Sequence, residues 1–153
     1  MIKMKIDYIL TDEKNEDFEN LTEELDKYFY SIFGDLTLEY EETHNMEGKH
    51  YFCIAYHDKK AISSSCFKIL NNETVEMKRF HVLKDYQNKN IGSKMISKLE
   101  NLAKDLNFKY SILETGSTMG TAINFYKKNG YKLIDNFEPF IGDENIVCMK
   151  KKL

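Results

Sequence analysis

Cysteine, proline, glycine and tryptophan are all scarce in this sequence. Among its 153 residues there are three cysteines, one proline and seven glycines, and tryptophan is absent. Cys53, Cys66 and Cys148 are far apart and lie in apolar runs, so we expect reduced, buried thiols instead of disulfides. The four histidines form no pair with metal-ligand spacing, and the sequence therefore predicts no metal site.

Long apolar runs and an excess of positive charge are lacking as well. No run approaches the roughly 20 apolar residues of a membrane-spanning helix. Lys3, Lys5 and Asp7 stand where a signal peptide would need an apolar core. These features predict a cytoplasmic protein without a membrane partner. With 22 Lys and Arg against 25 Asp and Glu, the net charge is −3, which disfavours a nucleic-acid partner.

The chain shows no internal boundary. It contains no linker rich in serine and glycine, no repeat and no low-complexity tract. Its 42% of hydrophobic residues suits one compact core. A chain of this size buries about 70% of its unfolded surface without help from a disulfide or a metal. We therefore expect one domain over residues 1–153.

The first half of the chain changes from an alternating to a helical pattern and back. Residues 3–10 alternate as a strand, and residues 15–33 predict an amphipathic helix that Gly34 ends. The apolar stripe of this helix comprises Phe18, Leu21, Leu25, Tyr28, Phe29, Ile32 and Phe33. The acidic segment 36–49 predicts a loop with at most a turn of helix. Three β-rich runs joined by short polar turns then predict consecutive antiparallel strands at 51–57, 61–70 and 74–83.

The second half alternates between helices and strands. A stripe of apolar residues from Ile91 to Leu106 predicts a long helix. It is followed by a predicted strand at 109–114, a helix at 121–129 and strands at 131–134 and 145–150. The order β-α-β-β-β-α-β-α-β-β predicts an α/β (α+β) fold with helices packed around one sheet.

The most informative segment joins the strand at 74–83 to the long helix. Its loop has the sequence Gln87-Asn88-Lys89-Asn90-Ile91-Gly92-Ser93. Backbone N–H groups at a helix start have no partner within the helix, and they lie at the positive end of its dipole. The loop could therefore hold a phosphate. Asn and Gly are also ordinary capping residues, so a plain strand-to-helix turn remains an alternative.

Two motifs here resemble the GNAT N-acetyltransferase superfamily. The string Q-x-x-N-x-G at Gln87–Gly92 resembles the family's acyl-CoA loop, Q/R-x-x-G-x-G/A. Residues Ala122–Tyr131 resemble its A-x-x-x-Y-x-x-x-G-F/Y helix, and the L-E-T-G string at Leu113–Gly116 and the order of elements agree. The resemblance covers about residues 3–150. It implies a single mixed sheet of six to seven strands flanked by helices.

The resemblance also implies a reaction, the transfer of an acetyl group from acetyl-CoA to an amine of a small molecule or peptide within a ternary complex. In the family, the main chain of the loop binds the cofactor pyrophosphate, and the pantetheine arm pairs with the preceding strand. The residues at these positions are Phe80, Val82, Gln87, Asn88, Lys89, Asn90, Ile91, Gly92 and Ser93. Asn88 and Asn90 stand where the family often has glycine. This departure motivates an alternative function, a non-catalytic acyl-CoA-binding regulatory module.

Glu76 and Tyr126 are the candidate catalytic residues that the resemblance implies. Glu76 lies eleven residues before Gln87, where relatives carry a glutamate that acts as general base. The alternatives are that Glu76 is an exposed carboxylate paired with Lys78, or that His81 is the base. Strand alternation places His81 on the opposite face from Glu76 unless a bulge intervenes. Tyr126 corresponds to the family's general acid, although a core aromatic is the alternative.

Two further expectations concern the oxyanion and the acceptor. The Phe80 N–H would stabilise the oxyanion. Carboxylates near the end of the first helix favour a cationic acceptor, although such a run is usually a solvated face. They are Asp26, Asp35, Glu39, Glu41, Glu42 and Glu47. The sequence does not decide between a monomer and a homodimer.

Overall fold

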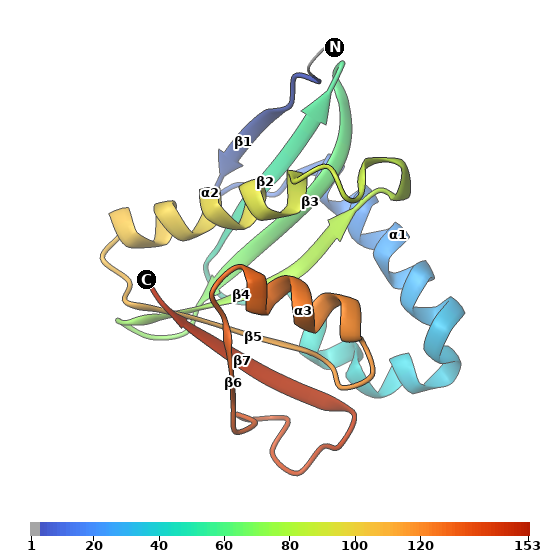
Figure 1. Cartoon of the computed structure of the whole chain (residues 1–153), viewed down its shortest axis with the longest axis vertical. Helices are drawn as coiled ribbons and strands as arrows, with labels where there is room; N and C mark the ends of the chain where they lie inside the picture. Colours follow the sequence, from blue (N-terminus) through green and yellow to red (C-terminus); the bar gives the residue numbers. More distant parts are fainter. Residues whose placement is uncertain (1–3) are drawn as a thin grey trace.

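A computed structural model describes residues 4–153, which form one seven-stranded sheet with helices on both faces (Figure 1). The strand order is β1-β2-β3-β4-β5-β7-β6. The strands are β1 (Asp7–Thr11), β2 (His50–His57), β3 (Lys60–Ile69), β4 (Thr74–Val82), β5 (Tyr110–Gly116), β6 (Lys132–Ile134) and β7 (Ile146–Lys152). The predicted fold class and order of elements are confirmed. Of the predicted first strand, Lys3 lies outside the described residues.

Helix α1 (Glu16–Phe33) begins as the sequence predicts, because the Asn15 side chain accepts a hydrogen bond from the Phe18 N–H. Only the first half of its apolar stripe, Phe18, Leu21 and Leu25, is buried. Tyr28 and Ile32 are each 50% exposed, so the predicted stripe is buried only over its first half. Beyond Leu25 the side chains of the helix are exposed or half-buried. A 3₁₀ segment, η1 (Gly34–His44), follows it.

Helices α2 (Ile91–Asp105) and α3 (Gly120–Lys128) lie on the other face of the sheet. The predicted stripe of α2 is confirmed, since Ile91, Met95, Ile96, Leu99 and Ala103 are all buried. They form the main core with buried side chains of the strands, such as Phe67 and Val75. Helix α1 and segment η1 thus cover one face of the sheet, and α2 and α3 cover the other.

The three cysteines are free and buried, as predicted. Burial raises the pKa of the Cys53 and Cys66 thiols to about 12, so these groups remain protonated and unreactive at neutral pH. Within residues 4–153, none of the helices has an apolar stretch that could cross a bilayer.

Strands β4 and β5 are parallel neighbours that separate soon after they meet. Thr74, Val75 and Glu76 pair with Tyr110, Ser111 and Ile112, and the ladder ends there. Figure 1 shows the two strands diverging beyond this point. Residues 77–82 of β4 therefore have no strand partner on the β5 side within the described chain.

Strand β4 also contains a β-bulge that changes which side chains share a face. Cys66 pairs with Lys78, whereas Ser64 pairs with His81, so Arg79 and Phe80 together lie opposite Ser65. The extra residue reverses the alternation and places His81 on the same face as Glu76. The expectation from simple alternation, that these residues lie on opposite faces, is therefore wrong.

Arg79 stabilises the bulge despite an unfavourable backbone. Its φ of 58° lies in the left-handed region, which costs a residue with a Cβ about 1 kcal/mol or more. The side chain is only 6% exposed, pairs with Asp26 and donates to the Thr22 carbonyl oxygen of α1. The ion pair thus links the bulge to α1.

Replacing Arg79 tests these two opposing effects. Both Arg79→Ala and Arg79→Gly lose the contacts with α1 and should have a lower free energy of unfolding than the wild type. Glycine relieves the left-handed backbone, so we expect Arg79→Gly to be more stable than Arg79→Ala by about 1 kcal/mol. Urea denaturation measures the difference. Equal stability of the two variants would show that the bulge is not strained.

Candidate functional site

The start of α2 presents a row of backbone amides. Asn90 is the N-cap residue, with a φ of 64°, and Asn88 has a φ of 61°. Asparagine adopts this left-handed region more readily than other residues with a Cβ, so both occupy positions where glycine would fit. No described residue accepts a hydrogen bond from the N–H groups of residues 88–93. Such a turn at a helix start is suited to binding an anion.

The loop before these amides is fixed by its own hydrogen bonds. A short 3₁₀ turn, η2 (Lys84–Tyr86), follows β4, and the Gln87 N–H donates to the Lys84 carbonyl oxygen. The Gln87 side-chain amide donates to the Val82 carbonyl oxygen over 3.0 Å. Gln87 therefore connects the free part of β4 to the amide row.

Gly92 allows α2 to approach the aromatic side chains below it. A Cβ at this position would lie 2.7 Å from Phe80 Cζ and 3.1 Å from Phe125 Cζ. The two phenylalanine rings are stacked with centroids 5.3 Å apart. Phe80 comes from the bulge of β4 and Phe125 from α3, so the glycine lets three elements meet.

Tyr126 is half-buried among these aromatic rings. Its ring makes edge contacts with those of Phe80, Phe125 and Tyr131. Burial, with a smaller contribution from the charge of Glu114, raises the pKa of the Tyr126 phenol well above its usual value of 10.0. The hydroxyl thus keeps its proton at neutral pH. Within the described chain it has no hydrogen-bond partner.

On the opposite face, Glu76 lines a cavity of about 590 Å³. Burial raises the pKa of the Glu76 carboxyl, and Lys78 and Lys68 partly oppose this rise. Lys78 does not form an ion pair with Glu76, because its ammonium group donates to the Thr43 carbonyl oxygen at 2.7 Å. The cavity is lined by Glu39, Tyr40, Glu42, Thr43, Asn45, Lys68, Leu70, Glu76, Lys78, Glu138, Pro139, Phe140 and Asp143.

The walls of this cavity come from segments distant in sequence. Tyr40 of η1 donates a 2.7 Å hydrogen bond to Asp143 in the loop before β7, which joins the two sides. Glu39 and Glu42, on either side of Tyr40 in η1, line the cavity. Asp26 is instead paired with Arg79, and Asp35, Glu41 and Glu47 do not line it. Only part of the predicted acidic run faces this cavity.

Sequence reasoning missed Glu114 of β5, which lies one residue beyond Leu113 in the L-E-T-G string. Burial and the negative charge of Glu76 raise the pKa of Glu114 to about 7. The signal for this residue was a carboxylate in an apolar strand. Glu114 lies close to Glu76 because β5 is the neighbour of β4 in the sheet, and the L-E-T-G motif alone does not show this pairing.

His81 shares the face of Glu76 but contacts a different element. Its Nε2 lies 3.9 Å from the Glu24 carboxylate of α1, and it does not line the cavity. Burial lowers the pKa of the imidazole, so His81 is neutral at pH 7. Glu76 therefore has the better access to a molecule in the cavity.

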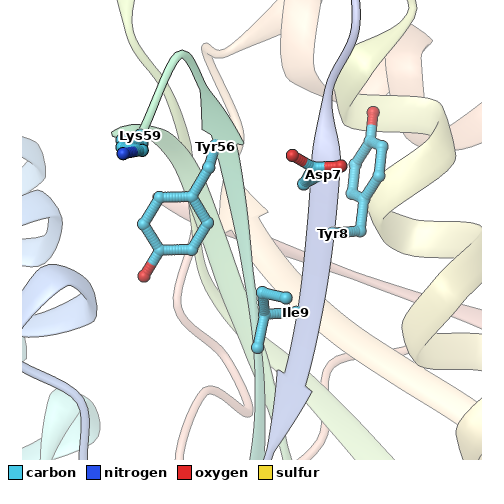
Figure 2. A pocket seen from close by; sticks show the side chains of 5 residues that line it. All are labelled: Asp7, Tyr8, Ile9, Tyr56 and Lys59. Carbon is cyan, nitrogen blue, oxygen red and sulfur yellow. The ribbon is translucent and has the colours of Figure 1, made fainter.

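A second hollow, of about 470 Å³, lies at the edge of the sheet beside β1 (Figure 2). It is lined by Asp7, Tyr8, Ile9, Tyr56 and Lys59. Figure 2 shows Tyr8 turned to the opposite side of β1 from Ile9 and Tyr56. The Tyr56 hydroxyl donates to Asp17 instead of pointing into the hollow. These side chains do not converge on a common point, and we assign no chemistry to them.

Comparison with known proteins identifies the family of the chain. Residues 18–131 match the sequence model of the acetyltransferase (GNAT) family. The chain belongs to the GNAT family. It is also 33% identical over 78 residues to an uncharacterized N-acetyltransferase of Dictyostelium discoideum. That match covers 51% of this chain but only 36% of the longer relative.

Solved GNAT structures share the fold over nearly the whole chain. An acetyltransferase of Staphylococcus aureus superimposes with a TM-score of 0.74 at 22% identity, covering 97% of this chain and 99% of that one. A family member from Elizabethkingia anophelis with acetyl-CoA bound gives 0.69 at 17% identity, covering 97% and 98%. The PaiA N-acetyltransferase of Thermoplasma acidophilum, in complex with coenzyme A, gives 0.71 at 20% identity, covering 96% and 99%.

Substituting glycines tests the packing at the start of α2. Gly92→Ala should lower the free energy of unfolding by about 1–3 kcal/mol, because the new methyl group overlaps the Phe80 ring. Gly120→Ala is the matched control, since a Cβ there meets nothing within 4 Å and alanine favours the helix. Thermal denaturation compares the two. A Gly92→Ala variant as stable as the control would contradict the close packing.

Proposed function

We propose that residues 1–153 form one N-acetyltransferase domain that transfers an acetyl group from acetyl-CoA to an amine. One observation carries the proposal, namely the row of free amides at residues 88–93 beside the unpaired stretch of β4. The amides suit a pyrophosphate, and the free strand edge suits the amide groups of a pantetheine arm. The acetyl-CoA and coenzyme A complexes of the structural relatives are consistent with this use of the fold.

The proposed cofactor-binding residues divide into two groups. The amides of residues 88–93 would hold the pyrophosphate, and Gln87 would fix the loop before them through its bonds to Lys84 and Val82. Asn88 and Asn90 adopt the left-handed backbone that glycine favours. Phe80 and Val82 would pair with the pantetheine arm through their main chains. Because this recognition uses the main chain, asparagine in place of glycine does not by itself argue for a non-catalytic module.

The chemistry needs a base, an oxyanion donor and an acid. Glu76, directly or through a water, takes a proton from the acceptor ammonium, and the free amine then attacks the thioester carbonyl carbon. The Phe80 N–H donates to the carbonyl oxygen as negative charge develops there. The C–S bond breaks as the carbonyl re-forms, and Tyr126 donates its proton to the leaving sulfur. The nitrogen of the new amide loses its second proton, which returns through water to the Tyr126 oxygen.

The cavity beside Glu76 supports a cationic amine as the acceptor. Five carboxylates line it, Glu39, Glu42, Glu76, Glu138 and Asp143, against two lysines. Opposite charge around the opening attracts an ammonium group and disfavours an anionic acceptor. The acceptor class is therefore a cationic small molecule or a peptide amine.

Calorimetry and a thiol-release assay test the proposal together. We expect saturable binding of acetyl-CoA and, with a panel of cationic amines, release of free coenzyme A. Binding without thiol release for any amine would indicate the regulatory alternative instead of an enzyme. The absence of any binding heat from folded protein at millimolar acetyl-CoA would reject both. Anionic amines as the best acceptors would reject the proposed acceptor class.

Glu76→Gln tests the proposed base. Removing the carboxylate should lower kcat by at least about 100-fold, since a general base contributes about 10²–10⁴-fold. His81→Gln serves as the comparison and should keep a kcat close to the wild-type value. Both are measured by thiol release at saturating acetyl-CoA. The reverse result, with His81→Gln inactive and Glu76→Gln active, would transfer the role to His81.

Tyr126→Phe tests the proposed acid. We expect kcat to fall about tenfold without being abolished, because a thiol of pKa near ~8.5 leaves readily as a thiolate. The affinity for acetyl-CoA should change little, since the phenyl ring keeps its contacts with Phe80 and Phe125. An unchanged kcat across pH would show that Tyr126 is only a core aromatic.

A further inference from the structure

Glu114 is a half-buried acid that the proposed chemistry does not yet use. None of the described residues donates a hydrogen bond to its carboxyl group or forms an ion pair with it. A half-buried carboxyl without such a partner is costly to ionise. The position of Glu114 beside Glu76 suggests a role for this carboxyl group.

The strand register places Glu114 beside Glu76. Glu76 is the last β4 residue that pairs with β5, and its partner is Ile112. Side chains two residues apart on a strand share a face, so Ile112 and Glu114 lie on the side of Glu76. Glu114 is therefore the diagonal neighbour of Glu76, at the point where the two strands begin to separate.

Charged and titratable groups act on Glu114 from every element around it. On β4, the negative charge of Glu76 opposes ionisation of Glu114, and the positive charges of Lys78 and Arg79 favour it. Asp143, in the loop before β7, also opposes ionisation. Two weak acids complete the surroundings, Tyr126 of α3 and Cys148 of β7, and the charge of Glu114 raises the pKa of each.

We propose that Glu114 is a positioning residue of the acetyl-transfer site, whose carboxyl group keeps the neighbouring Glu76 able to accept a proton near neutral pH. The inference rests on the proposed function. The repulsion between the two carboxylates is mutual, so they titrate as a pair. Glu76 raises the pKa of Glu114, so Glu114 is the carboxyl that ionises last. Once Glu114 is ionised, its charge increases the proton affinity of Glu76, and without Glu114 the Glu76 carboxylate would be a weaker base. The acceptor proton ends on the pair and passes to water after the product leaves.

Carbon-13 spectra of the glutamate carboxyl groups test the pairing without reference to activity. One resonance, absent in Glu114→Gln, should titrate with a midpoint near the pKa of about 7 expected for Glu114. In Glu76→Gln this midpoint should fall, because the neighbouring negative charge is gone. Glu42→Gln removes a carboxylate from the same cavity away from Glu114 and should leave the midpoint unchanged. An unchanged midpoint in Glu76→Gln overturns the pairing.

The pH dependence of kcat/KM, measured by thiol release with one cationic amine, tests the effect on Glu76. In the wild type the profile should bend near pH 7, where the pair loses its last proton, and activity falls below this pH. In Glu114→Gln the bend should move to lower pH, with kcat reduced no more than about tenfold, whereas Glu76→Gln loses at least about 100-fold. Glu114→Asp keeps the charge and should restore the bend.

Several results would overturn the inference. Glu114 is itself the base if Glu114→Gln lowers kcat by at least about 100-fold while Glu76→Gln keeps its activity. If the bend stays at the same pH in Glu114→Gln, the carboxyl group does not tune Glu76. A wild-type protein that binds acetyl-CoA but releases no thiol would instead reject the proposed function, and the carboxyl titration would still decide whether the pair exists.

Discussion

The separation of β4 from β5 is the constraint on which the rest of the site depends. Their ladder ends at Glu76 and Ile112, and beyond it a stretch of β4 has no strand partner. In a closed sheet the same residues would be paired to β5. The main-chain groups of β4 near the start of α2 would then be hydrogen-bonded to β5, and an extended ligand could not pair with them. The separation of the two strands leaves the main-chain groups of residues 77–82 without a strand partner on the β5 side within the described chain.

The bulge in β4 assigns side chains to these two faces. Phe80 lies with Phe125 and Tyr126 on the α2 and α3 side, where Gly92 permits close packing. Glu76 and His81 lie on the other side, with α1 and the acidic cavity. A ligand bound along the free strand would therefore meet aromatic rings on one side and carboxylates on the other. The ion pair between Arg79 and Asp26 of α1 stabilises the bulge, although Arg79 has an unfavourable left-handed backbone conformation.

Burial increases the proton affinity of the acidic groups where β4 and β5 separate. It raises the pKa of Glu76, Glu114 and Tyr126, because a low-polarity environment disfavours each charged form. A carboxyl with a raised pKa is a stronger base, and a phenol with a raised pKa keeps its proton. The same physical cause thus makes the two carboxylates better proton acceptors and keeps the Tyr126 hydroxyl protonated at neutral pH.

The sequence by itself determined the order of elements, the stripe of α2, the free amides before it and the family, because these depend on local periodicity and short motifs. It could not give the bulge at Arg79, since an extra residue in a strand leaves no periodic signal, and so it placed His81 on the wrong face. It also overestimated the buried stripe of α1, because the size of the surface beneath a helix is a property of the whole sheet. The proximity of Glu76 and Glu114, 38 positions apart, arose only when α2 brought β5 back parallel to β4.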